Sequence, residues 1–214
     1  MEILKELIAV ILHLDQYLST VIGQYGVWTY AILFLIIFCE TGLVVTPFLP
    51  GDSLLFTAGA LAAITPIEVG WLLPSLILAA VAGDNTNYWI GYHVGPGIFR
   101  KEKSFFLKRE YLDKTHRFYE RHGGKTVILA RYMPIVRTFA PFVAGVGRMN
   151  YGRFFLFSII GGISWIMLFV LAGYFFGNIP IVKENFTLVI MGVIAVSVLP
   201  ALIEFLRSKW GKAE

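Results

Sequence analysis

Cysteine is nearly absent from this sequence, and its absence excludes one large class of secreted proteins. The chain has 214 residues and a single cysteine, Cys39, which lies inside an apolar run. Because one cysteine cannot form a disulfide within a chain, a disulfide-stabilised extracellular domain is excluded. Residues 1–23 also lack the order of charged, apolar and small residues that marks a secretory signal. We therefore expect no exported soluble form.

The usual motifs of enzymes are missing as well. No spacing of histidines, cysteines or carboxylates resembles a zinc site, and no glycine-rich stretch has the context of a nucleotide-binding loop. No nucleophile is recognisable beside a general base. We expect a protein that is not an enzyme and that uses no metal and no cofactor.

Basic residues are scarce in the first half of the chain. Residues 1–99 contain one basic residue, Lys5, against seven acidic residues, whereas residues 100–214 contain seventeen basic residues against seven acidic ones. A basic half is found in some nucleic-acid-binding proteins. In an apolar chain it is more typical of membrane orientation, with the basic loops facing the cytoplasm. We expect membrane lipids, and no nucleic acid, as partners, and the oligomeric state is left open.

Long apolar runs are abundant. Hydrophobic residues make up 57% of the chain and occur in runs of about 20, the length that crosses a hydrocarbon core of about 30 Å. The sequence therefore predicts an all-α integral membrane protein with a single membrane domain over residues 1–214. Residues 1–23 form either an interfacial helix or a first membrane helix. The expected spans are residues 71–94, 154–176 and 186–206.

Two further apolar segments, residues 27–63 and 126–147, are interrupted by helix-breaking residues. Proline lacks a backbone N–H and disfavours helical geometry in the residue before it. The second arm of the first segment has only about 11 apolar residues, too few to cross a membrane alone. We therefore expect two re-entrant helical hairpins packed among the membrane helices. The expected breaks are Pro47, Pro50, Gly51, Pro134 and Pro141.

The charge pattern predicts how these segments are oriented. Residues 100–125 carry nine Lys or Arg against four acidic residues and have apolar positions at helical spacing, which indicates a cytoplasmic amphipathic helix. The basic C-terminal tail is also expected in the cytoplasm. Following the chain back from the tail, the first hairpin enters from outside and the second from inside. An offset of 91 residues aligns Glu40 with Arg131 and Pro50 with Pro141, as in an inverted repeat.

Five ionisable residues fall at membrane depth. Each charge costs at least about 2.5–3.5 kcal/mol at the bilayer centre, so these side chains must face one another or a water-filled cavity. A carboxylate that moves from water into an apolar cavity binds a proton more readily, whereas arginine stays charged and forks around a carboxylate or phosphate. Glu40 and Asp52 are therefore candidates for proton coupling. Arg131 and Arg137 are candidates for binding an anion, either these carboxylates or a substrate phosphate.

Asp84, the fifth of these residues, is accompanied by Asn87 three residues later. Two interpretations stay open for them. They form a polar cluster that packs helices together, or they belong to the site itself. Ion pairs that only lock the hairpins together are likewise an alternative for the other four charged residues.

Three stretches together resemble signature sequences of the DedA family. They are ETGLVVTPFLPGD at residues 40–52, Gly83-Asp84 followed by Asn87, Tyr88 and Gly91, and RYMPIVR at residues 131–137. The resemblance covers nearly the whole chain. It implies a multi-pass protein of the bacterial inner membrane with two oppositely oriented re-entrant hairpins. It also implies that the acid pair and the arginine pair are required for function, and it links the chain to lipid handling.

These observations predict a proton-linked translocase that flips a phosphate-bearing lipid, such as undecaprenyl phosphate or a phospholipid. The arginines would hold the anionic headgroup and the acids would exchange protons. One alternative is a proton-coupled antiporter for a small cation or drug, in which Glu40 and Asp52 bind the cation. A second is a non-transporting scaffold for envelope maintenance. A membrane phosphatase is disfavoured because no nucleophile is visible.

Overall fold

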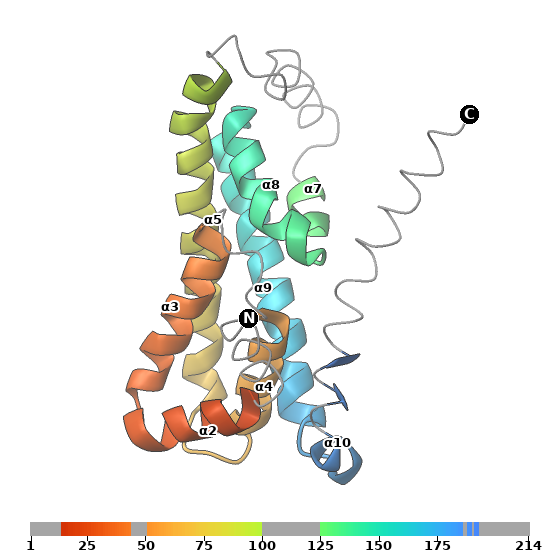
Figure 1. The fold of residues 1–214 in the computed structure, drawn as a ribbon. Coiled ribbons are helices and arrows are strands. Elements are labelled where there is room, and N and C mark those ends of the chain that lie inside the picture. Colours follow the sequence, from red (N-terminus) through yellow and green to blue (C-terminus); the bar gives the residue numbers. More distant parts are fainter. Residues whose placement is uncertain (1–13, 44–50, 100–124, 186–187, 190, 193–214) are drawn as a thin grey trace, which may run out of the picture. The chain divides into compact units, whose positions relative to one another are not determined.

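The described part of the chain folds into helices (Figure 1). The structure, a computed structural model, describes residues 14–43, 51–99, 125–185, 188–189 and 191–192. All regular secondary structure within these ranges is helical, as the sequence predicts. The helices are α2 (Leu14–Tyr25), α3 (Trp28–Gly42), α4 (Gly51–Ala62), α5 (Val69–Phe99), α7 (Lys125–Ala130), α8 (Pro134–Val146), α9 (Tyr151–Phe176) and α10 (Pro180–Glu184).

Two of the described helices are long and apolar enough to cross a membrane. They are Val69–Val94 within α5 and Tyr151–Phe176, which is α9, and each has 26 residues. At 1.5 Å per residue such a helix is about 39 Å long, which exceeds the hydrocarbon thickness. The spans expected at residues 71–94 and 154–176 are therefore confirmed as long apolar helices. Residues 1–13 and 100–124 and most of residues 186–206 lie outside the described part.

The helix breaks lie close to where the sequence places them. α3 ends at Gly42 and α4 begins at Gly51, while Pro47 and Pro50 lie outside the described residues. Pro134 is the first residue of α8. A backbone N–H at this position has no hydrogen-bond partner within the helix, so a proline is tolerated there. Whether either segment is a re-entrant hairpin, and whether the two form an inverted repeat, stays a prediction.

Pro141 differs from its predicted role as a break, because it lies inside α8, which continues to Val146. A proline removes one helical hydrogen bond and does not by itself end a helix that is held by packing. Here α8 packs closely on α5. A methyl group placed on Gly145 would collide with the carbonyl of Tyr88, and one on Gly91 would collide with the carbonyl of Phe142.

The described chain divides into two compact units, each considered by itself. Unit 1 contains residues 14–35 and 51–76 and the described part of 164–192. Its centre is α4, all twelve residues of which are buried. α4 lies so close to α9 that a methyl group on Gly59 would collide with the carbonyl of Val170. A helix of about 18 Å cannot cross a membrane alone, and this burial in protein shields it.

Unit 2 contains residues 36–43, 77–99 and 125–163. Its apolar core gathers around Tyr88 of α5, whose ring stacks on Phe154 with centroids 4.5 Å apart. The hydroxyl of Tyr88 donates to the carbonyl of Met149 at 2.6 Å. This core holds α5, α8 and the start of α9 together, and two of the five predicted charged residues, Asp84 on α5 and Arg137 on α8, lie on these elements.

Candidate functional site

The short break between α7 and α8 presents two arginines to the interior of unit 2. The N–H of Arg131 donates to the carbonyl of Ile128 at 3.1 Å, which closes a turn at the end of α7. Pro134 then starts α8, and the N–H of Arg137 makes the first helical bond of α8, to Met133, at 2.8 Å. The two guanidinium groups therefore come from either side of a proline-initiated helix start.

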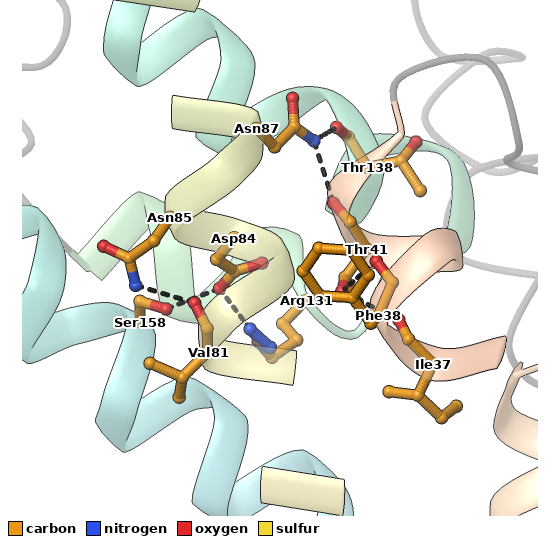
Figure 2. Close-up of polar contacts among 10 residues, drawn as sticks. All are labelled: Ile37, Phe38, Thr41, Val81, Asp84, Asn85, Asn87, Arg131, Thr138 and Ser158. Carbon is orange, nitrogen blue, oxygen red and sulfur yellow. Dashed lines mark hydrogen bonds and ion pairs between the residues drawn. The ribbon is translucent and has the colours of Figure 1, made fainter. Parts of the chain in front are cut away.

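Arg131 forms an ion pair with Asp84 in the middle of α5 (Figure 2). Each side chain is only 3% exposed. The hydroxyl of Ser158 in α9 donates to the same carboxylate oxygen at 2.6 Å, so three helical segments meet at Asp84. A methyl group on Gly161 would come within 3.3 Å of Nε of Arg131, so this glycine makes room for the arginine side chain.

Arg137 forms a second buried ion pair, with Glu40 near the end of α3. The exposed fractions are 4% for the arginine side chain and 1% for the glutamate. Taking a charge out of water costs several kcal/mol per ion, and close pairing offsets this cost. The sequence leaves open whether the arginines bind the carboxylates or a substrate phosphate. In the structure Arg137 pairs with Glu40, and the functional roles of both residues stay predictions.

Asn87, one turn beyond Asp84 on α5, joins two other segments of unit 2. Its side-chain N–H groups donate to the carbonyl of Thr41 at 2.9 Å and to that of Thr138 at 2.7 Å (Figure 2). Asn87 is fully buried. Asp84 is therefore a member of an ion pair, whereas Asn87 joins α3, α5 and α8 through backbone carbonyls.

Comparison with known proteins identifies the family. A family model described as the VTT domain matches residues 49–175. The chain belongs to the DedA family. It is 56% identical to Protein DedA of Escherichia coli strain K12 over 98% of this chain and 96% of that protein.

Relatives with lower identity support the same family assignment. It is 47% identical to an uncharacterised membrane protein, Rv0364, of Mycobacterium tuberculosis, over 87% of this chain and 84% of the relative. It is 32% identical to inner membrane protein YqjA of Escherichia coli K12, over 71% and 69%. No solved structure matches the chain. Because relatives are named as membrane or inner membrane proteins, and two helices are long enough to cross, this DedA-family chain is a membrane protein.

Asp52, the remaining predicted acid of this DedA-family protein, lies in unit 1, in the first turn of α4. It is 8% exposed, and its Oδ1 accepts a hydrogen bond from the indole N–H of Trp165 at 2.9 Å. Negative charge is favoured at this end of a helix because the first backbone N–H groups point toward it. The structure thus places Asp52 against an indole donor of α9.

The sequence alone assigns no role at the charged residues to three others: Ser158 and Gly161, which contact the pair of Arg131 and Asp84 in unit 2, and Trp165, which contacts Asp52 in unit 1. All three lie on α9, which reads as an ordinary apolar span. The one available signal is the presence of polar and small side chains on a helix that is otherwise strongly apolar. Among the described residues, no group of three or more His, Cys, Asp or Glu is placed to hold a metal ion.

Proposed function

We propose that this protein is a proton-linked translocase that moves a phosphate-bearing lipid across the bacterial inner membrane. The observation that carries the proposal is the buried ion pair of Glu40 and Arg137. Ionisable side chains at membrane depth are costly and are usually kept for function. Arginine binds carboxylate and phosphate with the same forked geometry, so a phosphate can take the place of the glutamate.

The two ion pairs of unit 2 are suited to different tasks. The carboxylate of Asp84 accepts from both Arg131 and the hydroxyl of Ser158, and it lies in the middle of a long helix. Glu40 lies two residues before Gly42, the last residue of α3. We therefore assign exchange of partners to Glu40 and Arg137, with Arg131 as a second positive charge for the headgroup.

The proposed cycle couples one proton to one headgroup. When Glu40 binds a proton, its carboxyl group loses its charge and no longer holds Arg137. The guanidinium then binds the lipid phosphate, while the acyl chains stay in the bilayer. When the proton leaves, the glutamate competes for Arg137 again and the phosphate is released. Asp52 is proposed as a second proton-exchanging acid, and the C-terminus is proposed to face the cytoplasm.

The test uses purified protein in liposomes that contain labelled undecaprenyl phosphate or, in parallel, a labelled phospholipid. We expect flipping of one of them by the wild type and its loss in Arg137→Ala. The matched control is Arg153→Ala, which removes an exposed arginine that lies outside the ion pairs. Equal flipping by wild type and Arg137→Ala would refute the role of this arginine.

A second variant addresses the proton. Glu40→Gln keeps the shape of a protonated glutamate and cannot ionise, so its flipping should respond less to a pH gradient than that of the wild type, and the response that remains is assigned to Asp52. A response equal to that of the wild type would remove Glu40 from the coupling. Proton-dependent movement of a small cation, with no lipid flipping, would instead favour an antiporter. Movement of neither would favour a scaffold.

A further inference from the structure

Asn87 is linked to the ion pair of Glu40 and Arg137 through the backbone of neighbouring residues. Its amide nitrogen donates both hydrogens, one to the carbonyl of Thr41 and one to the carbonyl of Thr138. Both acceptors are carbonyl oxygens, which can only accept, so the orientation of the amide group is determined. Figure 2 shows its own oxygen pointing away from both contacts.

The two acceptors are the residues that directly follow the ion pair in the sequence. Thr41 follows Glu40, and Thr138 follows Arg137. Neighbouring Cα atoms are about 3.8 Å apart, so a bond to one residue constrains the backbone of the next. A single amide group therefore bonds to the backbone next to Glu40 and to the backbone next to Arg137.

The face of α5 that carries Asn87 is built for this close approach. Gly83, Asn87 and Gly91 follow one another at intervals of four residues and so share a face of the helix. A methyl group on Gly83 would collide with the side chain of Thr41, and one on Gly91 would collide with the carbonyl of Phe142. The glycines let α3 and α8 approach α5, and Asn87 lies between them and bonds to both.

We propose that Asn87 is a positioning residue that holds α3 and α8 at the separation at which Glu40 and Arg137 meet. Its effect on transport rests on the proposed function, whereas its effect on helix separation does not. Among membrane helices, small residues allow close packing, and directed hydrogen bonds between helices add to the packing that holds one separation. Without them, the two helices are expected to sample a range of separations and the ion pair to form only part of the time.

The test measures the helix separation directly. Cys39→Ser removes the only cysteine, and Leu43→Cys with Phe139→Cys adds spin labels at exposed positions beside α3 and on α8. Pulsed electron paramagnetic resonance then gives the distribution of distances between them. Asn87→Leu removes both donors at similar size. Asn87→Asp is also of similar size and retains at most one hydrogen-bond donor. It replaces Asn87→Leu in the experiment if the leucine variant does not fold. We expect both variants to broaden the distribution.

The matched control is Thr86→Val, which removes a hydroxyl that bonds only within its own helix, to Ala82, in the contacts described. We expect it to leave the distribution narrow. Lipid flipping by the two Asn87 variants should fall about 100-fold, the size of effect that a misplacement of about 1 Å can produce. An unchanged distance distribution in folded Asn87 variants would overturn the proposal.

The remaining outcomes separate this proposal from the proposed function. A broadened distribution with unchanged flipping would overturn the positioning role in transport. A broadened distribution in a protein whose wild type flips no lipid would leave the positioning role in place and refute the lipid translocase.

Discussion

The buried pair of Asp84 and Arg131 allows a quantitative test of how this site is held together. Asp84→Leu removes a carboxylate that accepts from Arg131 and Ser158 and leaves the guanidinium buried without it. Breaking a buried ion pair in this way costs about 3–5 kcal/mol, because the remaining charge stays out of water. Arg131→Met should cost a similar amount for the same reason.

The double variant is expected to be more stable than either single one. Replacing both partners by apolar side chains of similar volume is often neutral, so Asp84→Leu with Arg131→Met should cost less than about 2 kcal/mol. The coupling energy between the two sites is then at least about 4 kcal/mol, above the range of about 0.5–3 kcal/mol usual for residues in contact. Ser158→Ala serves as a scale, because losing one hydrogen bond to a charged group costs about 1.5–3 kcal/mol.

The assay is reversible unfolding in mixed micelles, followed by tryptophan fluorescence, for the wild type, the two single variants and the double variant. Additive costs, with the double variant less stable than each single one, would contradict the argument. That result would mean that the guanidinium is hydrated and that the carboxylate contributes little to its stability.

Two further predictions concern unit 1. Gly59→Ala should destabilise the protein strongly, because the added methyl group would collide with the backbone of α9 at Val170. The control Gly70→Ala has nothing within 4 Å of the added methyl group and should be neutral or stabilising by up to about 1 kcal/mol. The same unfolding assay compares the two variants, and equal stability would refute the close approach of α4 and α9. Trp165→Phe should cost about 1.5–3 kcal/mol, because the carboxylate of Asp52 loses its indole donor, whereas the exposed Trp71→Phe should cost less than about 0.5 kcal/mol. Circular dichroism can follow unfolding for these tryptophan variants, and equal costs would show that the indole bond contributes nothing.

The helices and their breaks could be predicted from the sequence because local properties decide them. Apolar runs of about 20 residues form spans, and Pro134 starts a helix because its ring has the helical φ and lacks the N–H that a first turn does not use. Pro141 shows the limit of this reasoning. The same residue type lies inside α8, since close packing on α5 outweighs one lost hydrogen bond.

The sequence by itself also determined that Glu40, Asp52, Asp84, Arg131 and Arg137 must be shielded from lipid, because charge is costly at membrane depth. It could not determine the partners. Arg131 meets Asp84 across 47 residues, and Arg137 meets Glu40 across 97. The indole of Trp165 reaches Asp52 across 113 residues. Any of the three acids could satisfy either arginine on charge alone, and only the packing of α3, α5 and α8 within unit 2 decided which ones do.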